Sequence, residues 1–227
     1  MSAYAEELFT PRAAHADEFA AAALDAIQSL PAGSRVLDIG CGSGDLIRRA
    51  QRPGVSFVGV DISRPNIETA KASGGAEFHC ADFLRFDGGQ FNVVFANSVL
   101  HLIDGPNTTV AATLSRTIRP HGLLVAAMPI DTAHNRLLAF QRRLWSAMPQ
   151  RLDRWIGSAV SSILKDTSVV ERLVYLRVPP TRLLGTRFSE AMERNGFRLA
   201  STHRMHADHP LKLQHAIATW RKVTDSF

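Results

Sequence analysis

The chain has 227 residues, of which 45% are hydrophobic and 21% charged, and its formal net charge is +5. This composition is typical of a soluble globular protein, and the length suits one domain with a sizeable core. The two cysteines, Cys41 and Cys80, are too few for a disulfide framework or a four-cysteine zinc site. The N-terminus carries acids where a signal peptide needs bases, and no apolar run is long enough for a membrane span. We therefore expect a cytoplasmic protein without a membrane partner.

Helical and extended segments alternate along most of the chain. Strands are expected at residues 35–39, 56–61, 76–82, 91–97 and 123–128. Helices are expected at about residues 13–30, 45–51, 63–74, 106–118 and 186–195. Because continuous apolar strands that alternate with helices are buried on both sides, the pattern predicts a parallel sheet covered on both faces.

The C-terminal part has a different pattern. Residues 131–185 contain helix-compatible sequence and no convincing strand. Two extended runs, 197–207 and 213–223, are separated by Asp208-His209-Pro210, which is too short for a helical crossover, so the runs should pair antiparallel. The expected fold class is α/β, with a seven-stranded, mainly parallel sheet, one antiparallel strand, and a helical insertion after strand five.

A glycine-rich turn follows the first expected strand. Gly40, Gly42 and Gly44 allow the backbone to turn tightly and to approach a ligand without a side chain between them. The next helix begins near this turn, so its exposed N–H groups face the same space. Asp61 ends the second strand roughly twenty residues further on, where a carboxylate can accept hydrogen bonds from ribose hydroxyls. These features predict a ligand that contains a nucleoside.

The residues around the glycines distinguish between two such ligands. The dinucleotide fingerprint is G-x-G-x-x-G, and Asp45 occupies the place of its third glycine. A pyrophosphate beside Asp38 and Asp45 would be repelled, whereas a cationic ligand with an amino group would not. The sequence therefore favours a sulfonium amino acid over NAD.

The segment Asp38-Ile-Gly-Cys-Gly-Ser-Gly44 resembles motif I of class I S-adenosylmethionine-dependent methyltransferases. Further segments resemble the later landmarks of that family in the right order, at residues 60–63, 81–83, 91–103 and 114–122. The resemblance covers about residues 34–129 and, more loosely, the final hairpin. It implies a Rossmann-like three-layer sandwich whose reversed strand is the seventh, inserted between the fifth and sixth. It also implies S-adenosyl-L-methionine as cofactor and S-adenosyl-L-homocysteine as product.

The resemblance gives the domain organisation that we expect. Residues 1–227 would form a single methyltransferase domain. Within it lie an N-terminal helical cap (1–30), a cofactor-binding core (34–129), a helical lid insertion (131–185), and a last helix with an antiparallel hairpin (186–227).

The cofactor contacts follow by matched position. The implied cofactor-binding residues are Asp38, Gly40, Cys41, Gly42, Gly44, Asp61, Ile62, Asp82, Phe83 and Asn97. The backbone of the glycine turn would meet the methionine part, and Asp38 would support the loop or reach the amino group through water. Asp61 would hold both ribose hydroxyls. Two plainer interpretations stay open: Asp38 only caps the loop, and Cys41 is a small buried filler.

The other contacts concern the adenine and the methyl group. Ile62 would pack on the adenine, Asp82 would accept from its exocyclic amine, and Phe83 would supply a backbone or ring contact. Asn97, at the end of strand four, would lie beneath the reacting methyl. Asp82 is open to a second interpretation as a simple turn cap.

Candidate residues for the methyl acceptor are less well defined by the sequence. His101, four residues beyond Asn97, is the preferred base or substrate-orienting group, although it also fits the start of a loop. The tail histidines are expected at the surface; they are His203, His206, His209 and His215. The lid and the N-terminal segment supply the expected substrate residues, which are Tyr4, Arg12, Asp131, His134, Trp145 and Tyr175.

The sequence predicts a methyltransferase that acts on an oxygen or nitrogen nucleophile of a small molecule, working as a monomer or homodimer. Asn97 stands where metal-dependent catechol-type enzymes have an Asp, so no metal is expected. The mixed charges do not predict a nucleic-acid partner. Three alternatives remain: methylation of RNA or of a protein side chain, a catalytically silent protein that binds the cofactor, and an NAD-dependent oxidoreductase.

Overall fold

A computed structural model of the protein describes residues 13–149, 177–206 and 212–223. Its strands are β1 (Arg35–Ile39), β2 (Ser56–Asp61), β3 (Glu77–Cys80), β4 (Phe91–Asn97), β5 (Ile118–Pro129), β6 (Phe197–Arg204) and β7 (His215–Lys222). Its helices are α1 (Ala13–Ile27), α2 (Asp45–Ala50), α3 (Arg64–Ser73), α4 (Asn107–Thr117), α5 (Ala133–Ala147) and α8 (Thr186–Arg194), with the short 3₁₀ helices η2 (Phe83–Arg85) and η3 (Leu100–Leu102). None of the described helices combines the length and apolar composition that a bilayer crossing requires.

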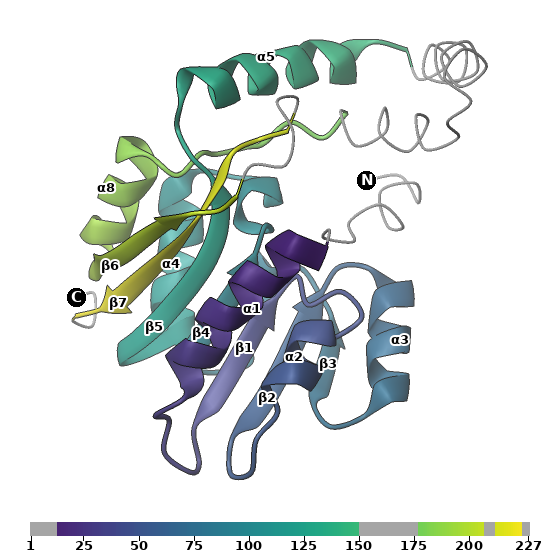
Figure 1. Cartoon of the computed structure of the whole chain (residues 1–227), viewed down its shortest axis with the longest axis vertical. Coiled ribbons are helices and arrows are strands. Elements are labelled where there is room, and N and C mark those ends of the chain that lie inside the picture. The colour runs from purple at the N-terminus through teal and green to yellow at the C-terminus, as the bar shows by residue number, and fades with distance from the viewer. Residues whose placement is uncertain (1–12, 150–176, 207–211, 224–227) are drawn as a thin grey trace.

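The strands of the described chain form one seven-stranded sheet in the order β3-β2-β1-β4-β5-β7-β6 (Figure 1). Neighbouring strands from β3 to β5 pair in parallel. Strand β7 runs antiparallel to both β5 and β6. The α/β fold class, the single reversed strand and its place between β5 and β6 are therefore confirmed.

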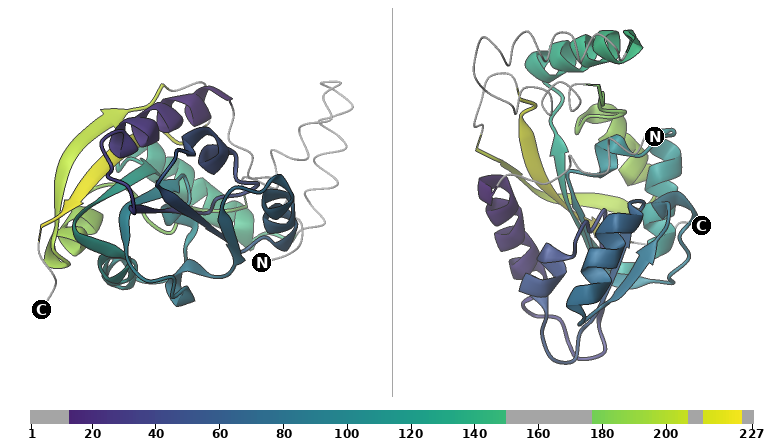
Figure 2. Two further views of the ribbon diagram at one scale, coloured as in Figure 1. Left: turned by 90° about the horizontal axis from the view of Figure 1, so that it is seen from below. Right: turned by 90° about the vertical axis from the view of Figure 1, so that its right-hand side faces the viewer.

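The central strands are apolar throughout because the sheet is covered on both faces. On β4, Val94 and Ala96 belong to one buried cluster, and the alternate residues Val93 and Phe95 belong to another. Helices α4 and α8 supply the first cluster, and α1, α2 and α3 supply the second (Figure 2). Successive side chains of a strand point to opposite faces of the sheet, and both faces are buried here. The strands are therefore continuous apolar runs in the sequence.

Most element boundaries agree with the sequence analysis, but β5 differs. It was expected to begin at Leu123 after a turn at Pro120-His121-Gly122, and it begins at Ile118. The turn residues form an irregularity inside the strand, where His121 has a φ of 64° and the pairing with β4 shifts register. The expected turn is thus wrong, because the strand pairs with β4 on both sides of the irregularity.

Helix α5 follows β5 directly and lies across the end of the sheet at which β5 ends (Figures 1 and 2). Thr132 caps the helix by accepting a hydrogen bond from the Asn135 backbone N–H. The buried Asn135 amide donates to the carbonyls of Ile130 (2.7 Å) and Gln214 (2.8 Å), and its oxygen accepts from the Gln214 N–H (2.9 Å). This side chain therefore fixes the start of α5 to the segments that end β5 and begin β7.

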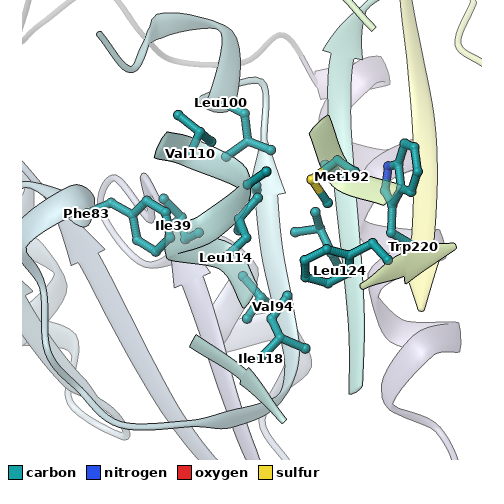
Figure 3. Packing of buried hydrophobic residues seen from close by; sticks show 14 of the residues in the cluster. Ile39, Phe83, Val94, Leu100, Val110, Leu114, Ile118, Leu124, Met192 and Trp220 are labelled. Atoms are coloured by element: carbon teal, nitrogen blue, oxygen red, sulfur yellow. The ribbon is translucent and has the colours of Figure 1, made fainter. Parts of the chain in front are cut away.

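The packing between the sheet and helix α4 gives a test of the fold. Leu114 on α4 is fully buried against the face of the sheet that carries Val94 and Leu124 (Figure 3). We expect Leu114→Ala to lower the free energy of unfolding by about 2–5 kcal/mol, because it leaves a cavity in a packed core. Chemical denaturation measures this change. The control is Leu137→Ala on the exposed side of α5, and an equal loss in both variants would contradict the assignment.

Candidate functional site

The carboxyl ends of the parallel strands bring the expected cofactor residues to one edge of the sheet. The loops after β1, β2, β3 and β4 all lie at this edge because the strands are parallel neighbours. Strand order reverses between β1 and β4, and ligands in open α/β sheets bind in the crevice at such a switch point. The glycine turn, Asp61, Asp82 and Asn97 therefore all border one region.

The glycine turn is held against its surroundings on one side and open on the other. The Gly40 and Cys41 N–H groups both donate to the Val60 carbonyl, at 2.7 and 3.2 Å. Gly40 has a φ of 68°, and a Cβ on it would lie 2.7 Å from the Val99 side chain. At Gly42, whose φ is 53°, an added Cβ would meet no atom within 4 Å. The backbone at Gly42 thus faces open space in which a ligand can approach it.

Asp61 joins the glycine turn to the start of α3. One carboxylate oxygen accepts from the Gly42 N–H at 2.9 Å, and the other accepts from the Ser63 N–H at 2.8 Å. The residue is half-buried. Because each carboxylate oxygen has two acceptor positions, Asp61 retains one on each oxygen for a vicinal pair of hydroxyls. The geometry fits a ribose at this point.

Asp38 is buried, with 3% of its surface exposed, and lies on β1 beside the glycine turn. Burial, and secondly the charge of Asp61, raise the pKa of its carboxyl to about 8. Burial and then the charges of Asp38 and Asp61 raise the pKa of the Cys41 thiol. Cys41 therefore stays a thiol, in keeping with its interpretation as a small buried side chain, and Asp38 is an acid that a nearby cation would ionise.

The ends of β2 and β3 form a second part of the edge. Ile62 has 54% of its surface exposed, which is high for an isoleucine beside a core strand. Asp82 is exposed and caps η2 by accepting from the Leu84 N–H at 3.0 Å. The Phe83 ring is buried in the core, so only its backbone faces the edge. An apolar surface at Ile62 beside the Asp82 carboxylate fits an adenine ring.

The loop after β4 turns sharply toward the glycine turn. Asn97 is half-buried, and its side-chain oxygen accepts from the Ser98 hydroxyl at 3.4 Å. Ser98 has a φ of 55°, an uncommon conformation for a residue other than glycine, and its N–H donates to the Ala127 carbonyl. This turn places Val99 against Gly40. His101 follows in η3, which begins directly after Val99.

His101 is buried, with 4% of its surface exposed, and its Nδ1 atom has no hydrogen-bond partner in the described part of the chain. The His215 ring lies 5.6 Å away, centroid to centroid, in an edge-to-face arrangement. Burial, and then electrostatic interactions with His215, Arg142 and Arg182, hold the pKa of His101 well below its ordinary value. His101 is therefore a neutral imidazole near neutral pH.

The structure corrects the expected position of one histidine and adds one arginine to this side of the edge. Of the tail histidines, His203 and His206 are exposed and His209 lies outside the described residues, but His215 is buried, so its expected surface position is wrong. The reason is its pairing with Pro129 at the first position of the buried strand β7. Arg182 was not predicted from the sequence; it is buried and donates to the Leu100 and Gly105 carbonyls. The only sequence signal for His215 was its place at the start of an apolar strand.

The expected substrate residues are dispersed. The Asp131 carboxylate accepts two hydrogen bonds from Arg136, which hold its pKa below the ordinary value. His134 contacts the Lys212 carbonyl at 3.3 Å, and the half-buried Trp145 lies under the Arg177 guanidinium. Tyr4, Arg12 and Tyr175 lie outside the described residues. In the described ranges, no group of three His, Cys, Asp or Glu side chains is arranged to hold a metal ion.

The chain is similar in sequence to known methyltransferases. Residues 36–122 match the family described as "Methyltransferase domain". The chain is 35% identical over 102 residues to a ubiquinone biosynthesis O-methyltransferase of Brucella anthropi, covering 42% of this chain and 41% of that protein. The chain thus spans about two fifths of the length of the curated relatives that it matches.

Two solved structures share the fold. A 1,6-didemethyltoxoflavin-N1-methyltransferase of Burkholderia thailandensis, with bound S-adenosylhomocysteine, superposes with a TM-score of 0.64 at 17% identity, covering 97% of this chain and 83% of that chain. The [4+2]-cyclase SpnF superposes with a TM-score of 0.61 at 15% identity, covering 91% and 80%. At these identities the likeness concerns the fold alone.

The buried Asp38 gives a test of the site's electrostatics. Its pKa is raised in the folded protein, so the folded state holds its proton more tightly than the unfolded state does. The stability that Asp38 contributes is therefore complete below about pH 4 and is lost as the pH rises to about 8. We expect the ligand-free protein to lose up to about 1.4 kcal/mol per pH unit relative to Asp38→Asn over this range. Urea denaturation at several pH values measures the difference, and parallel pH curves for the two proteins would contradict the raised pKa.

Proposed function

We propose that this chain is a class I S-adenosylmethionine-dependent methyltransferase and binds S-adenosyl-L-methionine at the carboxyl edge of β1, β2 and β4. It transfers the methyl group to an oxygen or nitrogen atom of a small molecule and releases S-adenosyl-L-homocysteine. The observation that carries the proposal is the Asp61 carboxylate, held by the Gly42 and Ser63 N–H groups with acceptor positions to spare.

Different residues along the edge contact different parts of the ligand. Asp61 accepts from the ribose hydroxyls, and the exposed Ile62 side chain covers one face of the adenine. The open backbone at Gly42 lies against the methionine part. Asp38 provides the negative charge that a ligand with an ammonium and a sulfonium group needs nearby. The site thus binds a cation that carries a nucleoside.

When bound, the cofactor supplies an electrophilic methyl group that is activated by its own sulfonium charge. The protein's task is then to position the acceptor and to exclude water. The turn at Ser98 directs Asn97 and η3 toward the glycine turn, so the acceptor is held on the β4 side of the edge. Helix α5, which lies across this edge, supplies a wall. A small molecule fits this arrangement, as it does the names of the O- and N-methyltransferases to which the chain is similar.

A second candidate function has one observation in its favour. The [4+2]-cyclase SpnF shares this fold, so the fold by itself does not determine methyl transfer. A chain that binds the cofactor without using its methyl group would bind S-adenosylmethionine and S-adenosylhomocysteine yet form no methylated product. Mass spectrometry of a broad panel of small acceptors separates the two functions.

Loss of the Asp61 carboxylate tests the cofactor site. We expect Asp61→Ala to weaken S-adenosylmethionine binding by at least about tenfold, because hydrogen bonds to a charged acceptor contribute about 1.5–3 kcal/mol each. Isothermal titration calorimetry measures the affinity, and unchanged affinity would remove the basis of the proposal. The matched control is Asp87→Ala, which removes an exposed acid from the loop before β4.

The protonation of Asp38 gives a second test. With a pKa of about 8 in the ligand-free protein, Asp38 is mostly protonated at pH 7, and a bound cation ionises it. We expect S-adenosylmethionine binding at pH 7 to release close to one proton, and its affinity to rise with pH to about 8 and then level off. Calorimetry in buffers of different ionisation enthalpy counts the protons. Asp38→Asn should abolish the release; an equal release from that variant would assign the proton to another group.

A further inference from the structure

Two buried histidines lie at the same edge of the sheet, beyond the residues proposed for the cofactor. His101 on η3 and His215 on β7 have 4% and 9% of their surfaces exposed, and their rings meet edge to face. The His215 Nδ1 lies 2.9 Å from the Leu213 carbonyl oxygen, which can only accept, so Nδ1 carries the proton. The His101 Nδ1 is buried without a partner in the described residues. Since a buried polar atom without a partner is costly, this atom indicates a ligand.

The topology places this pair next to the reacting methyl if the proposed function holds, and the inference rests on that function. Strand β7 is reversed, so its first residue, His215, pairs with Pro129 at the end of β5. On the other side, Val99 packs on Gly40 and precedes η3 by one residue. The two rings therefore lie on the β4–β5 side of the glycine turn, opposite Asp61 and Ile62.

Two buried cations act on His101, Arg142 on α5 and Arg182 in the segment before α8, and the His215 ring on β7 adds to their effect in lowering its pKa. The hydrogen bonds described for Arg182 go to neutral oxygens, those of Leu100, Gly105 and the Asn107 side chain, while Asp104 acts on it only through space. A positive potential around a buried neutral imidazole makes that imidazole a poor proton acceptor and stabilises an anion beside it.

We propose that His101 and His215 form the acceptor subsite, and that this subsite selects an acceptor that reacts as an oxygen anion: the anion of a phenol, of an enol or of a carboxylic acid. His101 donates a hydrogen bond from Nδ1 to the reacting oxygen and keeps its proton throughout. His215 is a positioning residue that holds the His101 ring by edge contact. The role of His101 is thus donation to the acceptor oxygen and not proton abstraction.

The reaction balances without a base in the protein. The acceptor gives its proton to water before it enters the subsite. A lone pair of the oxygen anion forms the new bond to the methyl carbon, and the carbon–sulfur bond breaks with its electron pair left on sulfur. Cation and anion become two neutral products. An amine that arrives as an ammonium ion is repelled by the same positive charges, and the neutral His101 ring beside it is a poor acceptor for its proton.

The experiment uses the full chain saturated with S-adenosylhomocysteine and follows its histidine side chains by NMR at about pH 7.5. The probes are 4-nitrophenol, which is ionised at this pH, benzoate, and benzylamine as the cationic counterpart. We expect both anions to shift the His101 and His215 signals and benzylamine to bind at least about tenfold more weakly. In the absence of probe, the His101 signal should stay that of a neutral ring well below pH 6.5.

Variants separate donation by His101 from a structural role. His101→Asn keeps an amide donor near the position of Nδ1 and should retain anion binding, whereas His101→Leu should lose at least about tenfold. His203→Leu, an exposed histidine on the neighbouring strand β6, is the matched control and should change nothing. Affinity for S-adenosylhomocysteine, measured by calorimetry in every variant, reports whether the fold and the cofactor site are intact.

The outcomes distinguish this inference from the proposed function. Failure of the wild-type chain to bind S-adenosylhomocysteine would refute the function itself. With that binding intact, the subsite assignment is overturned by any of three results. These are equal or tighter binding of benzylamine, full anion binding by His101→Leu, and the absence of any effect of the two anions on the His101 signal.

Discussion

The pair of hydrogen bonds from the Gly42 and Ser63 N–H groups to Asp61 is the contact on which the site depends. Strands β1 and β2 are held in register by their ladder, and the Gly40 and Cys41 N–H groups bond to Val60 in β2, but neither contact reaches the start of α3. A single carboxylate joins the loops after the two strands, so the glycine turn and the start of α3 have one relative position. Any ligand held by Asp61 is therefore also placed relative to the open backbone at Gly42.

Charge is divided along the edge of the sheet. Asp61 and, once a bound cation has ionised it, Asp38 make the β1–β2 side negative, while the buried Arg142 and Arg182 make the surroundings of His101 on the β4–β7 side positive. Such a division suits two ligands of opposite charge that must be brought into contact, because each is attracted to its own side. Methyl transfer removes the charge of both ligands, so the neutral products are bound less strongly than the charged reactants.

Local sequence patterns predicted most of the fold, but they predicted little of the region around His101 and His215. Strands such as β1 and β4 were predictable because burial on both faces leaves a continuous apolar run, and the glycine turn because only glycine adopts its conformations cheaply. Asp61 followed from its spacing. The burial of His215 was not predictable, since it depends on pairing with Pro129, more than eighty residues away. The bond from Asn135 to Gln214 spans 79 residues and that from Arg182 to Leu100 spans 82, and neither has a local sequence signal.

The reversed strand has a consequence for how this protein can vary. Side chains alternate between the two faces of a strand, so one extra residue inside β7 would exchange the side chains that face α4 and α8 with those that face α1. Trp220 would leave its buried place, and His215 would no longer stand opposite Pro129. Changes of length are thus expected to accumulate in the segment between β6 and β7, and lineages that diverge in substrate should keep the spacing from His215 to Trp220 constant.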